Sequence, residues 1–113
     1  MKYEIKVTSG FLKELKHLSK KYNSITEDLR QLSREIIDNP SIGKDLGNGL
    51  RKVRLAISSK NKGKSGGARV ITFSLIMSVD STDIFLISIY DKSEKENITI
   101  KELHERMSKE GLI

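Results

Sequence analysis

No aspartate or glutamate occurs between Leu46 and Val79 in this 113-residue sequence. The same stretch holds seven of the 21 lysines and arginines, namely Arg51, Lys52, Arg54, Lys60, Lys62, Lys64 and Arg69. The chain carries a net charge of +6, so the rest of it sums to 14 − 15 = −1. The positive charge is therefore local. A local basic surface is typical of a protein with a polyanionic partner, although a solvated basic face that binds nothing is the other interpretation of such a run.

Other absences narrow the class of protein. There is no cysteine, which excludes disulfides and cysteine-based zinc sites and fits a reducing cytoplasm. No apolar run approaches the roughly 20 residues of a membrane-spanning helix, and the segment from Met1 to Ile5 has no apolar core of a signal peptide. We expect a single domain over residues 1–113, in the cytoplasm, without a membrane, a metal or a cofactor.

The apolar periodicity predicts an α+β fold with the order β-α-α-β-β-β-α. Strands are expected at 3–7, 50–57, 69–77 and 84–90, and residues 41–49 and 58–67 are expected to be loops. Thr8 or Ser9 should cap the first helix. Ser24 with Glu27, and Thr99 with Glu102, have the spacing of capping boxes for the second and third helices. The last three strands should form a small antiparallel sheet, with the two N-terminal helices on one face.

Strand alternation predicts that the opposite, open face of the sheet carries basic side chains. Lys52 and Arg54 should point away from Val53 and Leu55, and Tyr90 and Lys92 should share their side. Arg69 has the parity of Ile71 and Phe73, so alternation turns it toward the helices. A bulge at Gly66-Gly67 would turn it to the open face instead, and the sequence leaves both possibilities open.

Three segments together resemble the RelE/ParE superfamily of toxins from bacterial toxin–antitoxin modules, and most of all its HigB-type branch. They are 49–54 (Gly-Leu-Arg-Lys-Val-Arg), 63–71 (Gly-Lys-Ser-Gly-Gly-Ala-Arg-Val-Ile) and 89–95 (Ile-Tyr-Asp-Lys-Ser-Glu-Lys). The resemblance implies a RelE-like fold, metal-independent endoribonuclease activity on mRNA in the ribosome, inhibition of translation, and a cognate antitoxin, expected to be of the helix-turn-helix type.

The resemblance also implies roles for individual residues. Lys52 and Arg54 match a basic pair, Arg69 matches an arginine that contacts the scissile phosphate, and Lys92 matches a basic position after the last strand. Crowded cations lower the pKa of a lysine, so Lys52 or Lys92 is the expected general base. The loop cations Lys60, Lys62 and Lys64, with Arg51, are expected to contact RNA.

One departure concerns a tyrosine that many RelE-like enzymes carry near the start of the last helix, where this chain has Asn97-Ile98-Thr99. Tyr90 either takes that catalytic role or only packs in the sheet. His17 and His104 lie on helices without a partner spaced to activate them, so we expect them to be surface residues. The alternative functions are a ParE-like gyrase inhibitor and a non-catalytic RNA-binding module.

Overall fold

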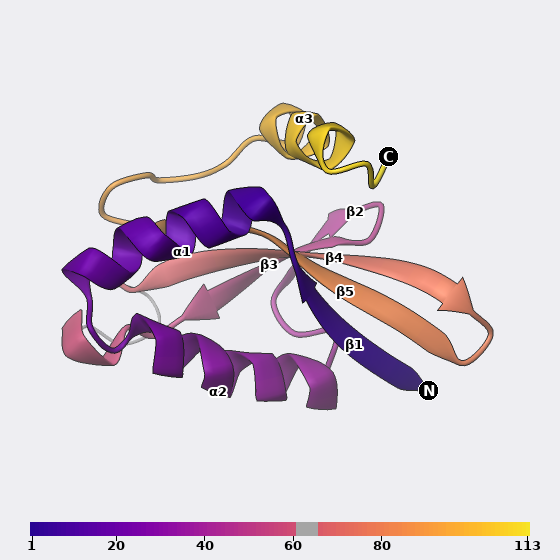
Figure 1. The fold of residues 1–113 in the computed structure, drawn as a ribbon, viewed down its shortest axis with the longest axis horizontal. Coiled ribbons are helices and arrows are strands. Elements are labelled where there is room, and N and C mark those ends of the chain that lie inside the picture. The colour runs from indigo at the N-terminus through magenta and orange to yellow at the C-terminus, as the bar shows by residue number, and fades with distance from the viewer. Residues whose placement is uncertain (61–65) are drawn as a thin grey trace.

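A mixed five-stranded sheet forms the centre of the molecule (Figure 1). The computed structural model describes residues 1–60 and 66–113. The elements in chain order are β1 (Lys2–Val7), α1 (Ser9–Lys21), α2 (Ile25–Asp38), β2 (Lys44–Gly47), β3 (Leu50–Leu55), the short 3₁₀ helix η1 (Ser58–Lys60), β4 (Ala68–Ser78), β5 (Ser81–Asp91) and α3 (Ile100–Lys109). The predicted α+β class is confirmed. No helix in these described residues is long and apolar enough to span a membrane.

The strand order β1-β5-β4-β3-β2 places β4 in the middle, β5 and β3 on either side of it, and β1 and β2 at the edges. β3, β4 and β5 are antiparallel neighbours, as predicted, and β1 pairs with β5 in parallel. β2 was not predicted, because residues 41–49 were interpreted as a loop. This short strand pairs antiparallel with β3 and carries a bulge between Asp45 and Gly47. Its length of four residues, of which the last is a glycine, hides the alternation that identifies longer strands.

The helix ends follow local capping chemistry. The Thr8 hydroxyl accepts a hydrogen bond from the Phe11 amide and so caps α1. Thr99 and Glu102 form the predicted capping box of α3. The capping box predicted at Ser24 is wrong, because the Ser24 hydroxyl donates to Asp28 and accepts from the Ser59 amide instead. These bonds attach the start of α2 to η1.

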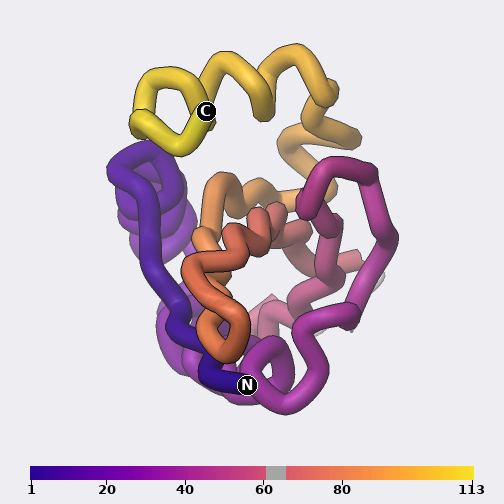
Figure 2. Tube along the Cα trace, turned by 90° about the vertical axis from the view of Figure 1, so that its right-hand side faces the viewer, coloured from indigo at the N-terminus to yellow at the C-terminus, as the bar shows by residue number. Residues whose placement is uncertain are grey.

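Both faces of the sheet bury apolar side chains. One core lies under α1 and α2 and includes Val53, Val70 and Ile89. A second core lies on the other face, where Ile71, Phe73 and Tyr90 pack with Leu103 and Met107 of α3. Both views show the strands between α2 and α3 (Figures 1 and 2). The face that was predicted to be open is therefore partly covered by α3.

A bulge in β5 interrupts the alternation of its two faces. Ile71 pairs with Ser88, but Thr72 pairs with Leu86, so Ile87 has no partner in the register. Ile89 consequently packs in the core under α1 and α2, and Ile87 in the core under α3. Without the bulge, strand alternation would place Ile87 and Ile89 on the same side.

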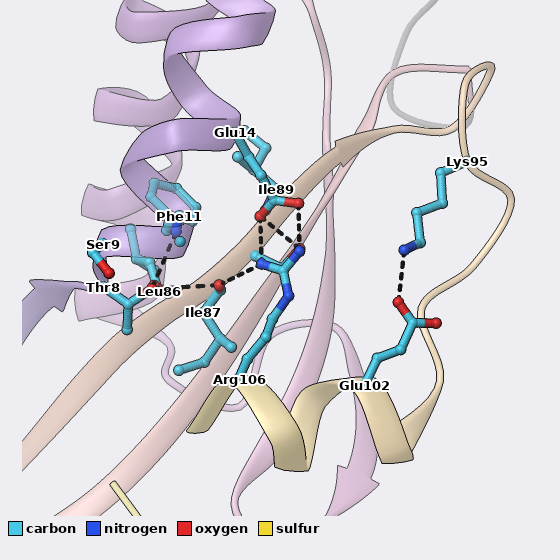
Figure 3. Close-up of polar contacts among 12 residues, drawn as sticks. Thr8, Ser9, Phe11, Glu14, Leu86, Ile87, Ile89, Lys95, Glu102 and Arg106 are labelled. Carbon is cyan, nitrogen blue, oxygen red and sulfur yellow. Dashed lines mark hydrogen bonds and ion pairs between the residues drawn. The ribbon is translucent and has the colours of Figure 1, made fainter. Parts of the chain in front are cut away.

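A salt bridge lies at this bulge and joins α1 to α3 (Figure 3). The Glu14 carboxylate accepts two hydrogen bonds from the Arg106 guanidinium, at 2.7 and 2.8 Å. It also accepts from the Ser88 hydroxyl and the Ile89 amide, and Arg106 donates to the Ile87 carbonyl at 3.3 Å. The salt bridge thus connects α1 and α3, which cover opposite faces of the sheet, at the bulge of β5.

Candidate functional site

A basic cavity of about 420 Å³ lies on the face of the sheet that also carries α3. The residues that line it are Gly43, Lys44, Lys52, Arg54, Arg69 and Lys92. They come from β2 and the residue before it, from β3 and β4, and from the residue after β5, which the sheet order brings together. None of these described lining residues is acidic.

Like charges face each other across the strands of this cavity. Lys44 is the register partner of Lys52, and Arg54 is the register partner of Arg69. Like charges directly opposite each other destabilise a sheet. An arrangement that costs stability in the free protein becomes favourable when a polyanion lies over it, so the cavity has the character of a phosphate-binding site.

Lys52 has the most perturbed environment of the cavity lysines. Partial burial lowers the pKa of its ammonium, and the charges of Lys44, Lys92 and Arg69 lower that pKa further. Its Nζ donates to the Asn97 amide oxygen at 3.2 Å, which directs the ammonium toward the segment before α3. A lysine with a lowered pKa is neutral more often near pH 7, which is the requirement for a lysine general base.

Arg69 lines the cavity, so of the two orientations that the sequence left open, the one toward α1 and α2 is excluded. Arg69 does share a side of β4 with Ile71 and Phe73, but these residues pack under α3 and not under α1 and α2. Arg69 is buried, with 5% of its surface exposed, and one guanidinium nitrogen donates to the Ala68 carbonyl at 3.1 Å. It lies between Arg54 and Tyr90 in the register of three adjacent strands.

Tyr90 belongs to the second core and does not line the cavity. It is 5% exposed, and its hydroxyl is buried without a hydrogen-bond partner in the described part of the chain. Burial raises the pKa of this phenol, and the neighbouring Arg69 charge opposes that increase. The prediction that Tyr90 lies on an open face is corrected, because α3 covers it.

The predicted RNA-contact residues do not gather in the cavity. Arg51 donates to the carbonyls of Ile42 and Gly43 at 3.0 and 2.8 Å, so it holds the segment before β2. The Lys60 ammonium lies 2.7 Å from Asp91, and its side chain is only 12% exposed, which contradicts the expectation of a freely exposed loop cation. Lys62 and Lys64 lie outside the described residues. His17 is exposed and contacts Glu94, in agreement with a surface position.

Sequence reasoning missed Gly43, Lys44 and Asn97. Lys44 belongs to the strand that was interpreted as a loop, and the sequence Gly43-Lys44-Asp45 carries no alternation signal. Gly43 has φ +88°, and a Cβ there would lie 2.3 Å from the Lys52 carbonyl oxygen, so a glycine is required at this approach to β3. Asn97 was considered only because it stands in the region where many RelE-like enzymes have a tyrosine, and its hydrogen bond with Lys52 was not predicted.

The antiparallel strands β3 to β5, with a helix pair on one face and a cation-lined cavity on the other, define the class of this small α+β protein. The family model for the RelE toxin of the RelE / RelB toxin-antitoxin system matches residues 11–110 of this chain. The chain therefore belongs to the RelE toxin family. Membership in a toxin–antitoxin system implies a cognate antitoxin as a partner.

The fold agrees with a solved member of this family. A mutant of the E. coli toxin RelE in the free state matches with a TM-score of 0.61 and 20% sequence identity. The match covers 96% of this chain and 97% of that one. At this identity the comparison shows a shared RelE-like fold and does not extend to the chemistry.

Proposed function

We propose that this RelE-family toxin is a metal-independent endoribonuclease that cleaves mRNA in the ribosome and so inhibits translation. The observation that carries the proposal is the acid-free cavity, in which Lys52 has a lowered pKa beside the Arg54–Arg69 pair. In this proposal the partners are the ribosome, mRNA and a helix-turn-helix antitoxin, the location is the cytoplasm, and the nearest branch of the family is the HigB type.

The proposed reaction needs three functions from the cavity. Neutral Lys52 accepts the proton of the ribose 2′-hydroxyl, and the 2′-oxygen then attacks the adjacent phosphorus. Arg69 and Arg54 stabilise the additional negative charge on the phosphoryl oxygens, a task for which guanidinium groups are suited because they bind two oxygens at once. Protonated Lys92 donates a proton to the departing 5′-oxygen. The products carry a 2′,3′-cyclic phosphate and a 5′-hydroxyl.

The predicted catalytic role of Tyr90 has less support than that of the four cations. Its side chain lies next to Arg69 in the sheet but packs in the second core. We therefore assign Tyr90 to the support of Arg69 and not to proton transfer. Arg51 and Lys60 are likewise assigned to structure, while Lys62 and Lys64 remain predicted RNA contacts.

Expression of the protein without an antitoxin tests the proposal. We expect translation to stop, and primer extension on cellular mRNA to show cuts that require translating ribosomes. Purified protein should cut mRNA bound to ribosomes and leave 2′,3′-cyclic phosphate ends. Intact transcripts together with blocked DNA supercoiling would replace the proposal with the ParE-like gyrase inhibitor. RNA binding without any cut would replace it with the non-catalytic RNA-binding module.

A further inference from the structure

A buried carboxylate directly precedes the cavity residue Lys92 in the sequence but lies on the other side of the sheet. Asp91 stands between Tyr90 and Lys92 at the end of β5. Strand alternation turns its side chain away from the face of Lys92, and that side chain has no exposed surface. The carboxylate is ionised: burial alone would raise its pKa, but hydrogen bonds from Lys60, Tyr22 and Ser93 outweigh burial and hold the pKa well below its usual range.

Asp91 joins three segments that are distant in the sequence. The Tyr22 hydroxyl, just after α1, donates to one carboxylate oxygen at 2.5 Å. The Lys60 ammonium at the end of η1 donates to the other at 2.7 Å, and the amide and hydroxyl of Ser93 donate to the same oxygen at 2.9 and 2.8 Å. Lys21 adds a longer ion pair at 3.8 Å.

Lys92 is fixed on both sides by these contacts. Its own amide donates to the Gly67 carbonyl at 3.1 Å, which attaches it to the start of β4. One residue later, the Ser93 amide is held by the Asp91 carboxylate. The Asp91 carbonyl also accepts from the amides of Glu94 and Lys95, so the chain turns tightly after Lys92. The backbone that carries the Lys92 side chain into the cavity therefore has little freedom.

The negative charge of Asp91 is compensated away from the cavity. Lys60 and Lys21 pair with it on the side of α1, and Lys60 also lies 5.5 Å from the centre of the Tyr22 ring. A carboxylate on the cavity face would repel phosphate and would weaken the field of Lys52 and Arg69. Buried ion pairs often add little to stability compared with apolar side chains, so the presence of one at this position calls for another reason.

We propose that Asp91 is a positioning residue for the cavity: by holding Ser93, Tyr22 and Lys60 together, it sets the place of the Lys92 ammonium relative to Arg69 and Lys52. The role rests on the proposed function, since Lys92 is the acid of that reaction. Asp91 touches no reacting atom in this scheme and acts through Lys92.

Asp91→Asn tests this role, with Glu14→Gln as the matched control. Glu14 is also a carboxylate that joins distant segments, but it serves α1, β5 and α3 and lines no part of the cavity. Amide hydrogen exchange should accelerate at Lys92 and Ser93 in Asp91→Asn and stay unchanged there in Glu14→Gln. Since a misplaced catalytic group costs up to about 100-fold in rate, single-turnover cleavage of ribosome-bound mRNA should slow by roughly that factor in Asp91→Asn only.

A double variant separates positioning from stability. If Asp91 acts through Lys92, then Asp91→Asn in a Lys92→Gln background should cause no further loss of cleavage rate. An additional loss, or equal rates in Asp91→Asn and the original protein, would overturn the proposal. Should Asp91→Asn fail to fold, Tyr22→Phe removes a single donor and should show the same effects in smaller degree. If the unaltered protein cuts no RNA, the proposed function fails, while the exchange rates still show whether Asp91 fixes Lys92.

Discussion

The surroundings of the Arg69 side chain are formed by three adjacent strands, β3, β4 and β5. It lies between Arg54 of β3 and Tyr90 of β5, and α3 covers the apolar residues beside it. Its charge is held close to Arg54 although like charges across a strand pair cost roughly 0.2–1 kcal/mol. Such a cost is retained in a protein when the same arrangement serves binding or catalysis.

Replacement of Arg69 by alanine should abolish toxicity and leave the fold intact. A preorganised donor to a developing oxyanion contributes on the order of 100–1000-fold in rate, and removal of the arginine also relieves its repulsion with Arg54. The measurement is single-turnover cleavage of ribosome-bound mRNA, with circular dichroism as the check on folding.

Arg30→Ala is the control for this experiment, because Arg30 is an exposed arginine of α2 that pairs with Glu27 and lines no part of the cavity. It should keep full activity. A well-folded Arg69→Ala protein with undiminished toxicity would remove Arg69 from the reaction, and with it the phosphate-stabilising half of the mechanism.

At the scale of elements, the helices and the long strands were predictable and their relative orientation was not. Leu29, Leu32 and Ile36 have helical spacing, and the apolar stretch at 84–90 indicated a central strand, which β5 is. The sequence does not say which apolar face of a strand meets which helix when both faces are covered. For this reason the sequence left the orientation of Arg69 open.

Short and irregular features were also beyond sequence reasoning. β2 has only four residues, and its pairing depends on contacts with β3. The bulge at Ile87 is a tertiary feature, accompanied by the Glu14–Arg106 salt bridge between α1 and α3. As a result, the members Lys52, Arg54 and Lys92 of the cavity could be predicted from strand alternation, whereas Lys44 and Gly43 could not.

The placement of β2 should depend on Gly43 and much less on Gly47. Both glycines have positive φ, +88° and +89°, so alanine at either position carries a backbone cost of roughly 1–2 kcal/mol. Of the two positions, only Gly43 would bring the new Cβ into collision with β3, 2.3 Å from the Lys52 oxygen. At Gly47 the described part of the chain places no atom within 4 Å, apart from the two adjoining residues.

Gly43→Ala should therefore lower the thermal unfolding temperature more than Gly47→Ala, and it alone should reduce cleavage, because β2 must move and take Lys44 out of the cavity. Unfolding followed by circular dichroism and single-turnover cleavage measure the two effects. Equal losses in both variants would mean that β2 adapts without disturbing the cavity.

At the scale of the whole molecule, some cations of the basic window line the cavity and others are bound by neighbouring groups of the protein. The Leu46–Val79 window holds seven cations, but the described ones do different work: Lys52, Arg54 and Arg69 line the cavity, while Arg51 and Lys60 are bound by their neighbours. Composition therefore indicated the local basic surface, and it overestimated the number of cations available to a ligand.

Acid should destabilise the protein in part through Asp91. Its pKa in the folded protein lies well below the value of about 3.9 expected in the unfolded chain. The ionised carboxylate thus contributes stability above about pH 4, and that contribution, on the order of 1–3 kcal/mol, is lost as the pH falls toward the folded pKa.

Urea unfolding between pH 2 and 7 measures this effect. The free energy of unfolding of Asp91→Asn should be lower than that of the original protein at pH 7 and should depend less on pH below 4. Asp38→Asn, which removes an exposed carboxylate at the end of α2, should leave the original pH dependence largely in place. Parallel curves for Asp91→Asn and the original protein would show that Asp91 does not couple folding to protonation.

The parallel pairing of β1 with β5 has a consequence for how the chain folds. Each residue of β1 meets a partner 81 − 2 = 79 positions later. Helices α1 and α2 can form as soon as they are synthesised, but β1 has no neighbouring strand until β5 exists. Contacts of such high sequence separation slow folding. During translation Tyr3 and Ile5 therefore have no strand partners until β5 has been synthesised. Until then the nascent chain exposes the unpaired backbone groups of β1.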